Sequence, residues 1–239
     1  RIRAAESPVG KAPIGSGGEM GKVLGVLGGM GPAATVAFLA RVQALTPAER
    51  DADHIRILAD INPQVPDRQR APDAAEAMLG RMAMRLRDAG AQVLAMPCNT
   101  AHALTTTIRK VGLPFIDMIA ETAEAAAAGG ARKIGVLATP GGEALYTRAL
   151  QARGAKIVRL TGADRQAIMA CINAVKAGDV GEAPRAEMRR LAAALVGAGA
   201  EVVIAGCTEV PLLLGPQDVS VPLVDSAEVL AAACVKACR

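Results

Sequence analysis

Two of the five cysteines stand in a repeated sequence context. Cys98 follows Gly90 within DAGAQVLAMPCNTA, and Cys207 follows Gly199 at the same spacing within GAGAEVVIAGCTEV. Each cysteine comes just after a short apolar run that is typical of a buried β-strand, and polar residues follow it. Ligands of open α/β sheets bind at the carboxyl ends of the strands, so we expect both thiols at a ligand-binding edge.

Two thiols at such edges suit proton transfer at a stereocentre. One thiolate would remove a proton from one face of a carbon atom, and the opposite thiol would deliver a proton to the other face. A disulfide switch is the alternative use of the pair. We expect the positive end of a helix after each cysteine to lower the thiol pKa. Charge that develops on a substrate carboxylate needs hydrogen-bond donors. The candidate donors are Asn99, Thr100, Thr139 and Thr208.

The two cysteines belong to a longer internal repeat. KVLGVLGGMGP is echoed by KIGVLATPGG, and LPFID is echoed by VPLVD. The spacing from Gly25 to Cys98 differs from the spacing between Gly135 and Cys207 by a single position. Three ordered matches at nearly constant spacing indicate two halves of one fold, in residues 22–117 and 131–225.

The elements that position the cysteines are short apolar runs that alternate with helical stretches. Runs without polar alternation indicate strands buried on both faces, as in parallel sheets covered by helices. Strands are predicted at 23–27, 55–59, 93–96, 134–137, 157–160 and 202–205, and helices at 73–88, 184–196 and 227–237. The predicted fold class is α/β, with two pseudo-symmetric doubly wound lobes, each with a roughly four-stranded parallel sheet, and the active site in the interlobe cleft. We assign residues 21–117 plus 226–239 to the first lobe, 118–225 to the second, and 1–20 to a leader or an artificial extension.

Composition excludes several classes of protein. The chain has 239 residues, of which 51% are hydrophobic and 1% aromatic. It is therefore too apolar for a disordered protein and lacks stacking platforms for nucleic acid. The net charge of +4 is too small to indicate a polyanionic partner. Residues 23–40 carry no charge and are long enough for a membrane span, but GGMGP interrupts them and favours a strand, a turn and a helix.

Cysteine usage indicates free thiols. Five cysteines without a CxxC pair, beside two histidines, predict neither a structural zinc site nor a disulfide framework. We therefore expect a cytoplasmic protein. Cys171, Cys234 and Cys238 lie in alanine-rich helical stretches and are interpreted as small buried core residues.

Five segments together resemble the aspartate/glutamate racemase family. They are GGMGP, NPQVPDR, MPCNTAH, LATPG and GCTEVPLLL. The resemblance is to the aspartate racemase branch, because glutamate racemases usually carry Asp-Ser in the first turn and Thr-His after the second cysteine, where this chain has Gly28-Gly29 and Thr208-Glu209. It implies a homodimeric racemase that interconverts L- and D-aspartate, with glutamate as the alternative substrate, and that uses two cysteines as acid and base. Its partner would be an amino acid with a second carboxylate, with no nucleic acid and no membrane.

The same motifs imply roles for further residues. Arg68 in PDR would bind a substrate carboxylate, and Lys176 matches a lysine of the active site in the aspartate branch. The turn with Gly29 and Met30 would shape the carboxylate end of the pocket. Supporting roles fall to Asp67, His102 and Glu209. No cofactor is expected, because GGMGP is not GxGxxG and no phosphate-binding GK[ST] loop is present.

Other functions remain open at this stage. The superfamily also contains hydantoin racemases, maleate isomerases and arylmalonate decarboxylases. Decarboxylation can work with one proton-donating thiol, so the presence of both cysteines disfavours it. A relative without turnover could hold a dicarboxylate between the lobes or sense redox state. The presence of Arg68 and both thiols argues against that role.

Overall fold

The computed structural model describes residues 21–239 and contains two parallel sheets. The residues assigned above to a leader or extension, 1–20, lie outside the described range. The first sheet has the order β2-β1-β3-β4, and its strands are β1 (Leu24–Gly28), β2 (Ile57–Ile61), β3 (Val93–Ala95) and β4 (Phe115–Ile116). The second sheet has the order β6-β5-β7-β8, and its strands are β5 (Lys133–Leu137), β6 (Lys156–Val158), β7 (Val202–Ala205) and β8 (Leu223–Asp225). The identical order and the uniformly parallel pairing confirm the predicted duplication.

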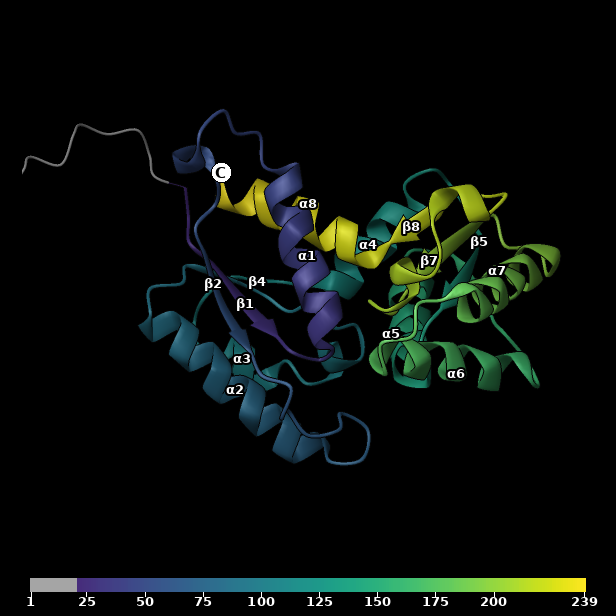
Figure 1. Ribbon diagram of the computed structural model, residues 1–239, viewed down its shortest axis with the longest axis horizontal. Coiled ribbons are helices and arrows are strands. Elements are labelled where there is room, and N and C mark those ends of the chain that lie inside the picture. The colour runs from purple at the N-terminus through teal and green to yellow at the C-terminus, as the bar shows by residue number, and fades with distance from the viewer. Residues whose placement is uncertain (1–20) are drawn as a thin grey trace, which may run out of the picture.

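Helices cover both faces of each sheet (Figure 1). The first sheet is covered by α1 (Pro32–Leu45) and α8 (Ser226–Cys238) on one face, and by α2 (Pro72–Asp88) and α3 (Thr106–Arg109) on the other. The second sheet is covered by α4 (Met118–Ala127) and α5 (Pro140–Gln151) on one face, and by α6 (Asp164–Lys176) and α7 (Glu182–Gly197) on the other. Strand β1 is buried along its whole length, as its uninterrupted apolar run predicts.

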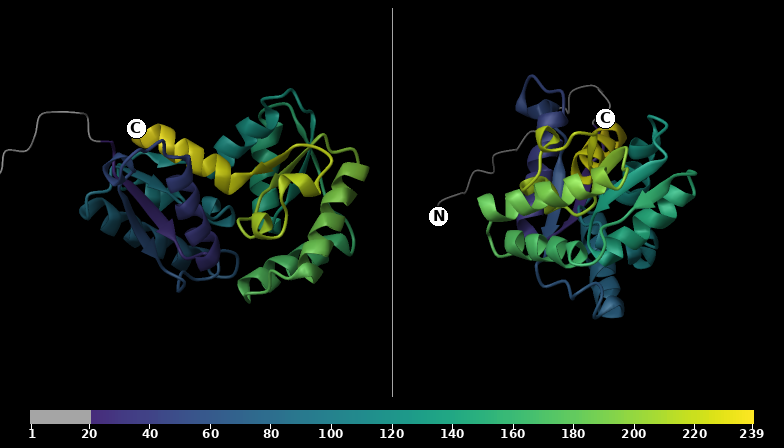
Figure 2. Two further views of the ribbon diagram at one scale, coloured as in Figure 1. Left: turned by 45° about the horizontal axis from the view of Figure 1, so that its top comes forward. Right: turned by 90° about the vertical axis from the view of Figure 1, so that its right-hand side faces the viewer.

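The lobes exchange one helix each. Helix α4 follows β4 of the first sheet but packs on the second, and α8 follows β8 of the second sheet but packs on the first (Figure 2). The repeated LPFID and VPLVD segments end in aspartates that begin these helices. Asp117 accepts hydrogen bonds from the first-turn amides of α4, and Asp225 does the same for α8. Because α4 and α8 also pack against each other, they join the two lobes.

Glycines end the helices that precede the two cysteine strands. Gly90 and Gly199 have φ angles of 102° and 91°, in the left-handed region that favours glycine. Each lets the chain reverse after α2 or α7 and enter β3 or β7. The equal spacing from glycine to cysteine therefore reflects one helix–turn–strand unit that occurs twice.

Element boundaries differ modestly from the sequence prediction. The strand predicted at 55–59 is observed two residues later, and the strand predicted at 157–160 ends at Val158. Both are edge strands, β2 and β6, whose pairing on one side only leaves their ends weakly specified. Cys171, Cys234 and Cys238 are buried helix residues, as predicted, and all five cysteines are free thiols.

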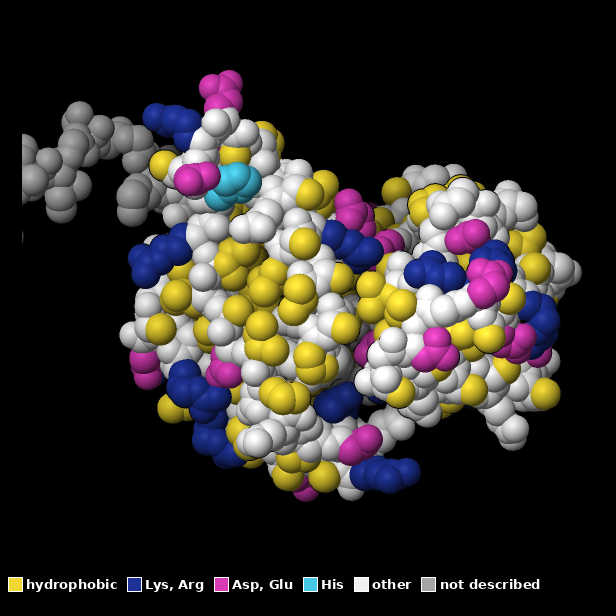
Figure 3. Space-filling model, viewed as in Figure 1, with side chains coloured by type: hydrophobic (Ala, Val, Ile, Leu, Met, Phe, Trp, Pro, Cys, Tyr) yellow, Lys and Arg dark blue, Asp and Glu magenta, His cyan; other side chains and the backbone are white. Residues whose placement is uncertain are grey.

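The first lobe has an exposed apolar region over α1. Figure 3 shows hydrophobic side chains gathered there, and Val36 is 59% exposed. Ile61, at the end of the edge strand β2, is 40% exposed. The expected homodimer stays a prediction. Within residues 21–239, none of the helices combines the length and the hydropathy needed to cross a bilayer.

Candidate active site

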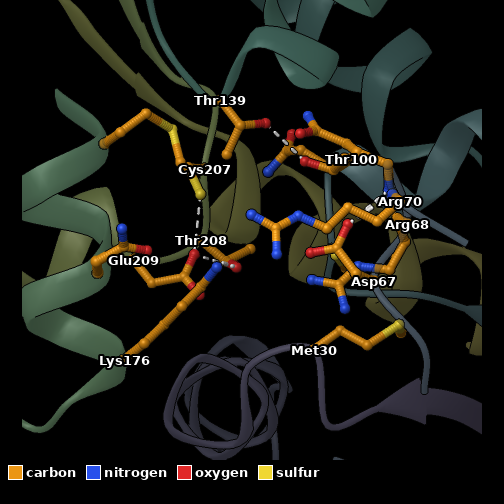
Figure 4. Close-up of a pocket in the computed structure, with 15 residues that line it drawn as sticks. Met30, Asp67, Arg68, Arg70, Thr100, Thr139, Lys176, Cys207, Thr208 and Glu209 are labelled. Atoms are coloured by element: carbon orange, nitrogen blue, oxygen red, sulfur yellow. Dashed lines mark hydrogen bonds between the residues drawn. The ribbon is translucent and has the colours of Figure 1, made fainter. Parts of the chain in front are cut away.

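A cavity of about 230 Å³ lies between the lobes at the carboxyl ends of the central strands. Both predicted catalytic cysteines border it: Met96 and Pro97 separate Cys98 from β3, and Gly206 separates Cys207 from β7. The cavity is lined by Met30, Asp67, Arg68, Gln69, Arg70, Cys98, Asn99, Thr100, Thr139, Met169, Asn173, Lys176, Cys207, Thr208 and Glu209. The tertiary structure thus brings together residues from both halves of the repeat (Figure 4).

Cys98 is 5% exposed and lies beside two cations. Burial raises the pKa of its thiol and the Glu209 carboxylate raises it further, whereas the positive charges of Arg68 and, more weakly, Lys176 lower it. The turn is tight, because the Cys98 amide donates to the Met96 carbonyl at 2.8 Å. Of the two cysteines, Cys98 therefore has the environment that better stabilises a thiolate.

Cys207 is 7% exposed and faces an acid. Its thiol donates a hydrogen bond to Oε2 of Glu209, with a sulfur–oxygen distance of 2.9 Å. Burial raises the pKa of the Cys207 thiol well above its usual value, and the Glu209 carboxylate raises it further. Cys207 is therefore held as a protonated thiol.

The prediction that helix ends lower both thiol pKa values was wrong. Only 3-10 segments of four and three residues, Thr100–Ala103 and Val210–Leu212, follow the two cysteines. Such short segments carry little dipole, and burial in the interlobe contact dominates the thiol pKa.

Arg68 and Lys176 enter the cavity from opposite sides, as Figure 4 shows, and Arg70 also borders it. Arg68 sits on a turn organised by Asp67, whose Oδ1 accepts from the amides of Gln69 at 2.8 Å and Arg70 at 2.9 Å. These amide hydrogen bonds lower the pKa of Asp67. Neither Arg68 nor Lys176 is within 4.0 Å of a carboxylate oxygen in the described part of the chain, so both charges are available to an anion.

Two threonine hydroxyls meet across the lobes. Oγ1 of Thr100 and Oγ1 of Thr139 are 2.7 Å apart, and Thr139 also accepts from the amide of Gly142. A single hydrogen bond between two hydroxyls uses only one of their two protons. Whichever threonine donates, the other retains a proton for a ligand carboxylate. Thr208 differs, because its hydroxyl donates to Oε2 of Glu209 at 3.3 Å.

Asn99 belongs to a buried relay that links the lobes. Its Oδ1 accepts from the hydroxyl of Tyr146 at 2.5 Å, and its Nδ2 donates to Oγ of Ser226 at 3.1 Å. Ser226 in turn donates to the carbonyl of Ala205 at 2.7 Å, two residues before Cys207. Oδ1 and one of the two Nδ2 protons are thus occupied, and the side chain fixes the Cys98 turn relative to the Cys207 turn. It is a positioning residue that also borders the cavity, and the substrate-donor role expected from the sequence stays a prediction.

Two other expected site residues are structural. Nε2 of His102 accepts from the Met118 amide at 3.1 Å, which leaves Nδ1 to donate to the Cys98 carbonyl at 2.9 Å. Burial lowers the pKa of His102, so the ring is neutral and ties the cysteine turn to α4. Gly29 has φ 97°, and a Cβ there would lie 2.4 Å from the Asn62 backbone. It shapes the turn, and its neighbour Met30 borders the cavity.

Sequence reasoning missed four lining residues, namely Gln69, Arg70, Met169 and Asn173. The first two follow Arg68 directly in the turn. Met169, Asn173 and Lys176 are spaced four and three residues apart on α6. Once Lys176 was a candidate, that helical spacing was the signal that placed the other two on the same face. No cluster of metal-binding side chains occurs within residues 21–239.

The fold and the site define a class of protein: two doubly wound lobes that each bring one thiol to a shared cavity. The family model described as Asp/Glu/Hydantoin racemase matches residues 27–234. The chain therefore belongs to the Asp/Glu/hydantoin racemase family.

Individual relatives agree with this assignment. The broad specificity amino-acid racemase RacX of Bacillus subtilis (strain 168) is 28% identical over 87% of this chain and 95% of its own. The aspartate racemase of Picrophilus torridus has a TM-score of 0.77 and 28% identity, covering 91% of this chain and 94% of its own. The glutamate racemase of Pseudomonas entomophila (strain L48) is 30% identical over 74% of this chain and 66% of its own.

Proposed function

We propose that this protein is a cofactor-independent amino-acid racemase in which Cys98 and Cys207 serve as base and acid. The observation that carries the proposal is that the two thiols border one cavity from matched strand ends of the two lobes. A base and an acid on opposite sides of a carbon atom are what inversion without substrate reorientation requires.

The different surroundings of the two thiols indicate which one acts as the base and which one acts as the acid in the first turnover. The Cys98 thiolate, favoured by Arg68 and Lys176, takes the α-proton, and the electron pair of the broken C–H bond moves into the substrate carboxylate. The free hydroxyl of the Thr100–Thr139 pair stabilises that charge, and Arg68 binds the second carboxylate of the substrate. The Cys207 thiol then gives its proton to the opposite face of the carbon atom and becomes a thiolate. The enzyme is left ready for the reverse reaction.

The preferred substrate in this proposal is aspartate. Two separate cations, Arg68 and Lys176, suit an amino acid with two carboxylates. Similarity to an aspartate racemase and to glutamate racemases supports an acidic substrate. Glutamate is the second candidate, because several of the relatives are named as glutamate racemases.

The test is incubation of pure L-aspartate or D-aspartate with the protein in D2O. We expect both to approach the racemate with deuterium at the α-carbon. Activity should survive dialysis against EDTA and treatment with hydroxylamine, and should be lost with iodoacetamide. Chiral chromatography and proton NMR measure the two processes, with glutamate as a parallel substrate. Binding of aspartate without turnover would identify a non-catalytic relative. Activity that is lost on treatment with EDTA and restored by a divalent ion would contradict the thiol mechanism.

The rate should rise with pH. Burial raises the pKa of the Cys98 thiol above the usual value of about 8.5, so the base is mostly protonated at neutral pH. Below that pKa each added pH unit increases the thiolate fraction, and kcat/KM should rise about tenfold per unit. The rise should continue beyond pH about 8.5, where an unperturbed thiol would level off. A rate that is flat between about pH 6 and pH 8 would exclude a thiolate base with a raised pKa.

A further inference from the structure

Two buried polar atoms lack a hydrogen-bond partner within residues 21–239, and both belong to this cavity. They are Nε of Arg68 and Oε1 of Glu209. Buried polar groups are nearly always paired, so each exception needs an explanation. One is a positively charged donor and the other is an acceptor on a carboxylate. A ligand that satisfies both must carry an acceptor with negative charge and a donor with positive charge.

The position of Glu209 limits which ligand groups can contact its free oxygen, Oε1. The residue is 3% exposed, and its other oxygen, Oε2, is already occupied by the Cys207 thiol and the Thr208 hydroxyl. Oε1 points toward the turn of the first lobe, where a Cβ on Gly31 would lie 3.3 Å away. A glycine at position 31 therefore leaves space beside Oε1 that any side chain would reduce. No Lys or Arg nitrogen lies within 4.0 Å of Glu209 in the described residues.

We propose that Oε1 of Glu209 binds the α-ammonium group of the substrate, while Nε of Arg68 donates to a carboxylate of the same molecule. This rests on the proposed racemase function and adds the reason why the site takes α-amino acids. An ammonium group has three donors and a positive charge, which match a buried carboxylate oxygen. A dicarboxylate without the amine would leave Oε1 unpaired and facing a ligand of like charge.

The arrangement also places the reacting carbon. The ammonium nitrogen is bonded to the α-carbon, and the same carboxylate holds the Cys207 thiol through Oε2. Glu209 thus sets the α-carbon beside the sulfur that exchanges a proton with it. The residue acts by binding and positioning, and the proton moves between sulfur and carbon.

The test compares aspartate with succinate, which has the same two carboxylates and no amine. Dissociation constants are measured by calorimetry with racemic aspartate and with succinate, for the wild type and for Glu209→Gln. Glutamine keeps an acceptor for Cys207 and turns its NH2 group to the place of Oε1. We expect aspartate binding to weaken about tenfold to a hundredfold, the range for a hydrogen bond to a charged group. Succinate binding should stay the same or tighten. Glu228→Gln makes the same change on exposed α8 and should alter neither constant.

A second variant retains the charge. Gly31→Ala adds a methyl group beside Oε1, so it should also weaken the binding of aspartate more than the binding of succinate. It keeps the test decisive if Glu209→Gln does not fold. Equal weakening of both ligands, or an unchanged ratio of their constants, would overturn the ammonium site. If the wild type racemises aspartate but Glu209→Gln leaves the ratio of the aspartate and succinate dissociation constants unchanged, the proposed function stands and the ammonium site is rejected. Failure of the wild type to bind aspartate at all would reject both.

Discussion

Replacing either Cys98 or Cys207 with serine should abolish racemisation, with a fall in kcat of at least about a thousandfold. A serine hydroxyl is too weak an acid and base at neutral pH to replace a thiol, and positioned proton transfer contributes about 10²–10⁴-fold. Both thiols are needed for each turnover because one removes the proton and the other delivers it. Chiral chromatography from either enantiomer measures the loss.

Each cysteine variant should still exchange the α-proton of one enantiomer for solvent deuterium. In Cys207→Ser, the remaining Cys98 can take a proton from one enantiomer and return solvent deuterium to the same face, so exchange occurs with retention. Cys98→Ser should exchange the α-proton of the opposite enantiomer. This exchange should be slower, because burial and Glu209 hold the pKa of Cys207 higher. Cys171→Ser is the matched control, since that thiol is buried in α6 with its sulfur 3.8 Å from the Pro184 carbonyl. Near-normal turnover by either active-site variant would remove the two-thiol mechanism.

Arg68→Ala should lower kcat/KM for aspartate by roughly 30-fold to several thousandfold. The guanidinium enters the cavity with Nε buried and unpaired in the described residues, and it has no carboxylate partner there. Removing it leaves a substrate carboxylate without its partner in a desolvated site, which costs about 2–5 kcal/mol. The Cys98 thiol also loses the strongest of the charges that lower its pKa. Steady-state kinetics with aspartate measure the change.

Two comparisons identify which carboxylate Arg68 binds. Alanine lacks the second carboxylate, so it should be a poor substrate for the wild type and should lose far less from Arg68→Ala. Arg81→Ala is the control, because Arg81 is exposed on α2 and does not line the cavity, so it should leave both rates unchanged. Equal losses for aspartate and alanine would mean that Arg68 holds the α-carboxylate. An unchanged aspartate rate would contradict any role in binding.

The repeat made the fold predictable. Each half has a glycine turn, a helix ended by glycine, a buried strand and a cysteine at nearly constant spacing, and apolar runs alternating with helices predict parallel sheets. The order of the strands within each sheet came from the tertiary structure. The motif predicted Lys176. It did not predict Asn173, which lines the cavity because it lies three residues earlier on the same face of α6. The end of each edge strand was less predictable, since few contacts specify it.

The sequence by itself determined two matched α/β halves and one thiol at the end of each central strand. It could not determine how deeply those thiols are buried or which charges lie near Cys98, because both depend on residues that are distant in the sequence, such as Arg68 and Lys176. Asn99 meets Ser226 across 127 positions, and this contact fixes the Cys98 turn against α8. The tertiary structure alone decided that Cys98 lies beside Arg68 and Lys176. Glu209 follows Cys207 in the same motif, and the structure added only that its carboxylate accepts from the thiol. Burial and the charges of distant residues, together with Glu209 of the second motif, therefore make two similar sequences chemically different.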